Sequence, residues 1–125
     1  MDAAVSGIDR AAPQRNTLPA AFRRARESLE AHAADPLDLE ELARQSGIGI
    51  RSLQLGFRRH FGGSISGVLQ NIRLQQLNVR LSKAGPDERV IDIAFDLGFT
   101  HLGRMASAYR AKFGESPSAT LRKSR

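Results

Sequence analysis

The chain has 125 residues, of which 41% are hydrophobic, enough for one compact domain or two small helical lobes. It contains no cysteine, which excludes a disulfide framework, a thiol nucleophile and a thiolate metal site. Neither a signal-like leader nor an apolar run of membrane-spanning length is present, so we expect a soluble cytoplasmic protein.

The net charge of +6 is distributed unevenly along the chain. Residues 1–41 carry five basic and eight acidic side chains, whereas residues 42–125 carry fourteen basic and five acidic ones. Between Leu42 and Pro86 there are seven Arg or Lys and no Asp or Glu. Such a window is typical of a protein that binds a polyanion, although a merely basic surface is the alternative. A membrane surface is disfavoured, because the arginines do not lie opposite one exposed apolar face.

The first 36 residues predict a leader and one helix. Residues 1–16 are small and polar, which is typical of a disordered leader or the remnant of an interdomain linker, and we expect a folded domain over 17–125. Pro19 suits the first turn of a helix, and Asp35–Pro36 ends it. Its apolar face consists of Phe22, Ala25, Leu29 and Ala33.

A helix-turn-helix is predicted at about 37–61. Asp38 is a suitable N-cap for the first helix, and Gly47 can take the left-handed conformation that ends it. The second helix is expected from about Ile50 to His60. Its inward positions are Ile50, Leu53 and Phe57, and its outward positions are Arg51, Gln54, Leu55 and Arg58.

Residues 64–83 predict one long helix with two apolar faces, capped by Ser64 and ended by Gly85–Pro86. One face comprises Ile65, Val68, Leu69, Ile72 and Val79, and the other comprises Leu74, Leu77 and Leu81. A helix that is apolar on two sides must bury both, so this segment should be the spine that links two lobes.

A second helix-turn-helix is predicted at about 88–113. Asp87 is a candidate N-cap, Gly98 ends the first helix, and Phe99 fills the corner. The apolar stripes are Val90, Ile93, Ala94 and Leu97 in the first helix, then Leu102, Met105, Tyr109 and Phe113 in the second. After Ser116–Pro117 we expect a short helix in which Leu121 packs back, followed by a basic tail of Arg122, Lys123 and Arg125.

The two helix-turn-helix segments are an internal repeat. The first helices and their turn glycines match at a separation of 51 residues, as Ala43 with Ala94 and Gly47 with Gly98. The second helices match at a separation of 52, as Phe57 with Tyr109. Two copies are too few for a solenoid, so the repeat predicts two tandem helix-turn-helix units.

With both units in place, the sequence resembles the DNA-binding domain of the AraC/XylS family of bacterial transcription regulators, from about Leu18 to Arg122. The motifs that carry the resemblance are LEELARQSGI at 39–48, LGFRRHFG at 55–62, VIDIAFDLGF at 90–99 and YRAKFGESPSATLR at 109–122. HLGR at 101–104 with FGESP at 113–117 resembles a branch that usually carries an N-terminal cupin-like sensor domain. The resemblance implies an all-α fold of about seven helices, whose two recognition helices enter adjacent segments of the major groove.

The resemblance also implies which residues contact bases. In the first unit these are Arg51, Gln54 and Leu55. Arginine suits guanine and glutamine suits adenine, whereas Leu55 could touch a thymine methyl group or simply cover surface. In the second unit the family positions are Leu102, Gly103, Ala106 and Ser107, a poor set for hydrogen-bonded readout. Nearby Arg104 could reach a base or a phosphate, and His101 could instead begin the helix.

Five further basic residues are candidates for phosphate contacts, namely Arg58, Arg59, Arg73, Arg110 and Lys112. The first unit is therefore expected to read the sequence and the second to anchor on phosphates. No cofactor or metal is expected, since the three histidines are scattered and no metal-ligand cluster is evident.

Two other classes of function are alternatives to DNA binding. Catalysis is disfavoured, because no nucleophile–base pair or phosphate loop is present, and DNA-repair methyl acceptors with a similar module need cysteine. A helical protein-interaction module that modulates a regulator without binding DNA is the alternative, and the acid-free window argues against it.

The sequence leaves open whether the chain is a stand-alone domain or part of a longer regulator. Activation is the commoner behaviour in the family, so we expect an activator. Family members can also contact RNA polymerase, and we expect this domain to be monomeric on its own.

Overall fold

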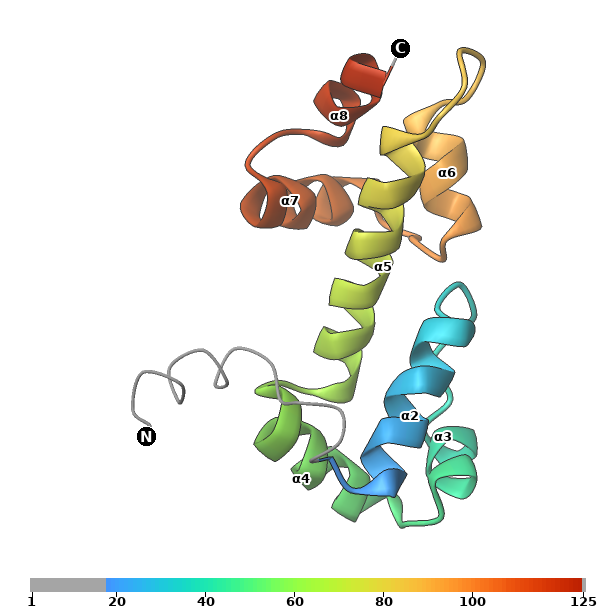
Figure 1. Cartoon of the computed structure of the whole chain (residues 1–125), viewed down its shortest axis with the longest axis vertical. Helices are drawn as coiled ribbons and strands as arrows, with labels where there is room; N and C mark the ends of the chain where they lie inside the picture. The colour runs from blue at the N-terminus through green and yellow to red at the C-terminus, as the bar shows by residue number, and fades with distance from the viewer. Residues whose placement is uncertain (1–17, 125) are drawn as a thin grey trace. The chain divides into compact units, whose positions relative to one another are not determined.

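The computed structural model describes residues 18–124, in which there are seven helices and no strand (Figure 1). The expected all-α fold is confirmed. The predicted leader at 1–16 and the tail residue Arg125 lie outside the described residues. Within residues 18–124, none of the helices has both the length and the apolar character needed to cross a membrane.

The chain divides into two compact units, and the boundary between them falls inside α5 (Ile65–Ser82). The first unit contains the first residues of α5 and three earlier helices, α2 (Ala20–Ala31), α3 (Leu39–Ser46) and α4 (Ile50–Phe61). The second contains the loop 32–36, the rest of α5, α6 (Val90–Asp96), α7 (Leu102–Phe113) and α8 (Pro117–Ser124). The predicted helix-turn-helix segments correspond to α3–α4 and α6–α7.

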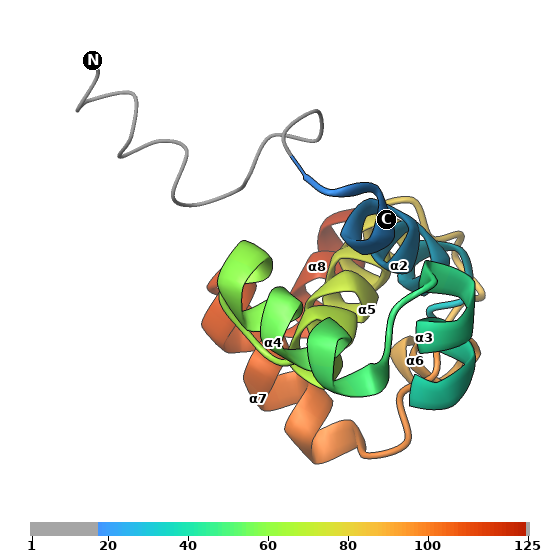
Figure 2. The same ribbon diagram turned by 90° about the horizontal axis from the view of Figure 1, so that it is seen from below.

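The core of the first unit forms where α2, α3 and α4 meet. Helices α2 and α3 lie side by side (Figures 1 and 2). Leu53 and Phe57 of α4 are fully buried, and the Phe57 ring meets Phe22 of α2 edge-on and Phe61 at a tilt. These apolar positions recur at helical spacing, so their burial holds one face of α4 inward.

The turn and caps of the first unit have the predicted chemistry. Gly47 has φ +81°, and its N–H donates to the carbonyl of Ala43, which ends α3 in the left-handed conformation. The Asp38 carboxylate accepts from the N–H of Glu41, and the Ser64 hydroxyl accepts from the N–H of Gly67 at the start of α5. Both predicted N-caps are thus confirmed.

The core of the second unit surrounds the later part of α5. Leu77, Leu81, Ile93, Ala94 and Tyr109 are almost completely buried, together with Leu74, Ala84, Phe99, Met105 and Leu121. Phe99 fills the α6–α7 corner and Leu121 packs back from α8, as the sequence predicted.

The buried Tyr109 hydroxyl fastens α8 to α5 and α7. It donates to the hydroxyl of Thr120 (2.8 Å) and accepts from the side-chain amide of Asn78 (2.9 Å). Thr120 in turn donates to the Glu115 carboxylate, which also binds Lys123. The hydrogen bonds from Lys123 and Thr120 hold the pKa of Glu115 below its usual value. Asn78, Tyr109, Thr120, Glu115 and Lys123 are thus linked in one continuous series of hydrogen bonds.

Two local predictions are wrong. Asp87 does not cap α6, because the helix begins at Val90, with Arg89 as an N-cap that makes no side-chain capping bond. The turn before it is instead held by the carboxylate of Glu88, which accepts from the N–H of Gly85. Val79 is 49% exposed, since the second unit packs on the opposite side of α5, where Leu77 and Leu81 lie.

Two glycines allow close approach of other segments. A Cβ at Gly56 of α4 would lie 2.0 Å from the ring of Phe22, so only glycine lets α2 pack there. Gly98 has φ +94°, and a Cβ there would lie 2.8 Å from the carbonyl oxygen of Ala34. Gly98 is therefore needed both for its backbone conformation and for space.

We expect Gly98→Ala to lower the free energy of unfolding by about 2–4 kcal/mol, because left-handed strain adds to a backbone clash. Gly62→Ala is the matched control. Gly62 has φ +76°, and no atom lies within 4 Å of a Cβ placed there, so only the strain of about 1 kcal/mol should appear. Urea unfolding followed by far-UV circular dichroism measures both. Equal losses would show that the Ala34 contact is unimportant.

Candidate nucleic-acid interface

The outward face of α4 gathers the predicted residues of the first unit. Burial of Leu53, Gly56 and Phe57 fixes which way the helix is turned. The residues on the opposite side are exposed, namely Arg51, Gln54, Leu55, Arg58 and Arg59. By helical spacing, Arg51, Leu55 and Arg58 form the middle of this face.

The same face of α4 borders an open hollow of about 310 Å³. Arg51, Gln54, Leu55 and Arg58 line one side of it. The start of α3 and the start of α5 line the rest, through Leu37, Leu39, Ser64, Ile65 and Ser66. The structure therefore brings all three predicted base-contact residues of the first unit together at one concave surface.

The outward face of α7 carries the predicted residues of the second unit. Gly103, Arg104 and Ser107 are exposed, whereas Met105 and Tyr109 are buried beneath them. Leu102, a family position, is partly buried and packs against the core. His101 is the N-cap of α7, where its Nδ1 accepts from the N–H of Arg104 (3.1 Å).

The internal repeat allows the two outward faces to be compared position by position. At the separation of 52 residues, Gly103 replaces Arg51 and Ser107 replaces Leu55, while Arg110 matches Arg58. The central positions of α7 are thus small, where those of α4 bear an arginine and a leucine. Helix α7 can approach a ligand closely with its backbone but has few groups with which to distinguish bases.

Six cations on α4 and α7 have no acidic partner among the residues that the structure describes. Within residues 18–124, no carboxylate lies within 4 Å of Arg51, Arg58, Arg59, Arg104, Arg110 or Lys112. Neither helix contains an acidic residue. Both therefore present net positive charge to solvent.

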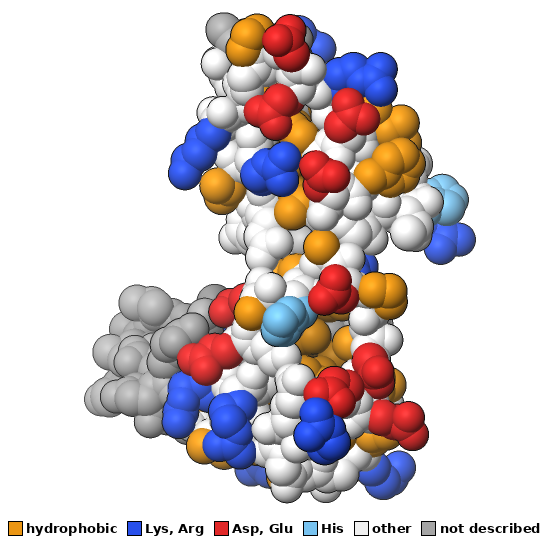
Figure 3. Space-filling view, turned by 90° about the vertical axis from the view of Figure 1, so that its right-hand side faces the viewer, with side chains coloured by type: hydrophobic (Ala, Val, Ile, Leu, Met, Phe, Trp, Pro, Cys, Tyr) orange, Lys and Arg blue, Asp and Glu red, His pale blue; other side chains and the backbone are white. Residues whose placement is uncertain are grey.

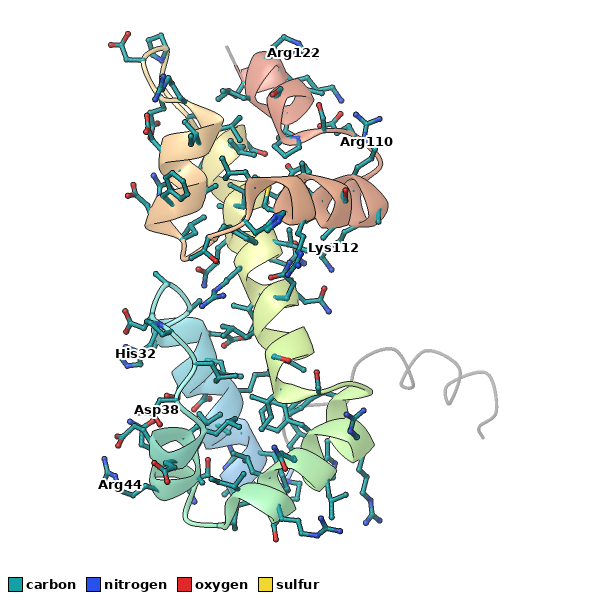
Figure 4. All side chains as sticks on the ribbon, turned by 180° about the vertical axis from the view of Figure 1, so that it is seen from behind. His32, Asp38, Arg44, Arg110, Lys112 and Arg122 are labelled. Atoms are coloured by element: carbon teal, nitrogen blue, oxygen red, sulfur yellow. The ribbon has the colours of Figure 1, made fainter. Side chains whose placement is uncertain are left out.

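Half of the eight described arginines outside α4 and α7 form ion pairs. Arg26, Arg44, Arg80 and Arg89 each form an ion pair with Asp or Glu. The face drawn in Figure 3 accordingly has acidic and basic side chains close to one another in each unit. At the end of α7, Arg110 and Lys112 leave the helix on different sides (Figure 4), as residues two positions apart in a helix must.

Arg73, a predicted phosphate contact, makes two hydrogen bonds within the second unit. Its guanidinium donates to the carbonyl of Ala33 (2.6 Å) and to that of Asp35 (2.9 Å), which fastens the loop 32–36 to α5. Partial burial lowers the pKa of Arg73, though an arginine remains protonated at neutral pH. Because two of its donor groups are used inside the second unit, we leave Arg73 out of the proposed phosphate contacts.

Arg24 is a supporting residue that the sequence analysis missed. Arg24 lies on the exposed side of α2, and its guanidinium donates to the carbonyl of Ser46 (2.8 Å) at the end of α3. This bond satisfies a terminal carbonyl immediately before the turn into α4. No local pattern signals it, since the two residues are 22 positions apart.

Two helix-turn-helix units, each with an outward cationic second helix, define a tandem helix-turn-helix protein of the kind that binds DNA. A family model described as "Helix-turn-helix domain" matches residues 42–123. A solved structure titled as a probable AraC family transcriptional regulator from Rhodopseudomonas palustris is 35% identical, with a TM-score of 0.78 over 84% of this chain and 97% of that one. The chain belongs to the AraC family.

Two curated relatives are also similar. The probable thc operon regulatory protein of Rhodococcus erythropolis is 43% identical over 84% of this chain and 32% of its own length. XylDLEGF operon transcriptional activator 3 of Pseudomonas putida is 37% identical over 82% of this chain and 31% of its own length. The chain therefore spans about a third of each, and both are named as regulators of operons.

We expect Arg73→Met to lower the free energy of unfolding by about 2 kcal/mol, because it removes two charge-assisted hydrogen bonds to loop carbonyls. The salt dependence of DNA binding should not change. Arg59→Met is the matched control, since Arg59 is exposed without an ion-pair partner: it should preserve stability and reduce the salt dependence. Urea unfolding and binding titrations distinguish the two, and the reverse pattern would restore Arg73 as a phosphate contact.

Proposed function

We propose that this chain is a sequence-specific, double-stranded DNA-binding domain that regulates transcription, with α4 and α7 entering two neighbouring segments of the major groove. The observation that carries the proposal is the set of six cations on these two helices without acidic partners within residues 18–124. A phosphate backbone supplies the missing negative charge. The duplicated fold and membership of the AraC family support the same function.

In this proposal the two units have different roles in DNA binding. Arg51 and Gln54 carry side chains that pair bidentately with guanine and adenine, and they lie on one exposed face of α4. The matching face of α7 is mostly small, so α7 approaches the backbone closely and holds it through Arg104 and Arg110. Sequence is then read chiefly by the first unit, and the second unit provides affinity.

Regulation of an operon is supported by the names of both curated relatives, and activation by the name of the Pseudomonas putida protein alone. Because the proposed ligand is genomic DNA, we place the protein in the cytoplasm of a bacterium. Contact with RNA polymerase, a monomeric state and a cupin-like sensor domain remain predictions from the family resemblance.

The division between the units can be tested by selecting bound sites from a random duplex library. Arg51→Ala and Gln54→Ala should each relax the preference at one base pair, costing about 1–3 kcal/mol of discrimination. Arg104→Ala should weaken binding to all sequences alike, because it contacts phosphate. Equal losses of specificity from the two units would contradict the division.

The phosphate contacts can be tested through salt dependence. Alanine at Arg58, Arg59, Arg110 or Lys112 should each reduce the slope of log affinity against log salt concentration by about 0.9. Arg44→Ala is the matched control, because Arg44 on α3 is exposed but already paired with Glu41. Its slope should equal that of the unmodified chain.

A gel shift with random duplex DNA separates this proposal from the alternative of a protein-interaction module. Non-specific binding in the micromolar range at physiological salt is expected for a cationic DNA-binding domain. No shift with any duplex, even at low salt, would sink the proposed function and favour the alternative.

A further inference from the structure

We propose that Leu55 reads the 5-methyl group of a thymine, which makes it a specificity-determining residue of the first unit. This inference rests on the proposed DNA-binding function and adds to it the chemical feature that α4 recognises. Leu55 is 57% exposed in the described chain, although leucine is normally a core residue.

The surroundings of Leu55 distinguish it from the other exposed apolar side chains. Val79 (49% exposed) lies on the later part of α5, and Phe95 (53% exposed) lies between Asp92 and Asp96 on α6. Leu55 instead lies about one turn after Arg51 and about one turn before Arg58, in the middle of the cationic face of α4. It also borders the open hollow beside that face.

The arginines on either side of Leu55 restrict which kind of partner can bury it. A protein surface that buried Leu55 would have to desolvate the guanidiniums of Arg51 and Arg58, which have no acidic partner within residues 18–124. A DNA duplex can cover Leu55 and also pair with both guanidiniums, since phosphates and guanine edges accept from arginine. The apolar group that the major groove presents is the thymine methyl group.

The geometry of α4 also fixes where that thymine lies. Leu55 follows Arg51 by four residues, which is about 6 Å along a helix. Successive base pairs are about 3.4 Å apart. The thymine should therefore lie within about two base pairs of the base whose preference is lost in Arg51→Ala.

Replacement of thymine by deoxyuridine tests this, because it removes the methyl group and leaves the hydrogen-bonding edge unchanged. The duplex is the site selected by the full 125-residue chain, with each thymine replaced singly. One replacement, within two base pairs of the Arg51 position, should weaken binding about four-fold, the effect of one buried methyl group. In Leu55→Ala the thymine and deoxyuridine duplexes should bind equally.

Val79→Ala is the matched control. It truncates another exposed apolar side chain away from α4, so the four-fold preference for thymine should remain. Leu55→Arg provides a second readout, because arginine at this position should select guanine in place of thymine when the library is searched again.

The outcomes of these experiments distinguish the role of Leu55 from DNA binding itself. A selected site that is indifferent to every deoxyuridine, or a thymine preference that persists in Leu55→Ala, overturns the role of Leu55 and leaves DNA binding standing. Failure to select any site overturns both.

Discussion

In each helix-turn-helix, the orientation of the second helix depends on two buried apolar side chains. In α4 these are Leu53 and Phe57, and in α7 they are Met105 and Tyr109, none more than 2% exposed. A helix anchored by two residues one turn apart cannot rotate about its axis without exposing them, at a cost of a few kcal/mol. Packing of the core therefore determines which residues of α4 and α7 face outward. No further contact is needed to orient the two helices.

That constraint explains how much of the interface could be predicted from the sequence. Once Leu53 and Phe57 are assigned to the core, helical spacing alone turns Arg51, Leu55 and Arg58 outward, and the structure has them exposed. The turn glycines and the Asp38 and Ser64 caps are also local features, since each involves residues within four positions. Local chemistry was sufficient for all of these.

The features that could not be predicted depend on distant segments. Arg73 binds carbonyls 38 and 40 positions away, so its charge looked free in the sequence and is used inside the fold. Val79 continued an apolar stripe, but only the packing of α6 and α7 on the other side of α5 explains why it is 49% exposed in the described chain. A mid-helix glycine such as Gly56 does signal a close neighbour, yet only the structure identifies it as Phe22.

The two helix-turn-helix units share a scaffold, whereas their outward faces differ. Phe57 and Tyr109 occupy matching core positions, because packing restricts them in both copies. The turn glycines Gly47 and Gly98 also match, because both have positive φ. The exposed positions carry no such restriction, and there Arg51 and Leu55 stand opposite Gly103 and Ser107. A residue that the fold does not require is free to be set by the ligand. The difference between the two faces is therefore where the specificity of this chain should be sought.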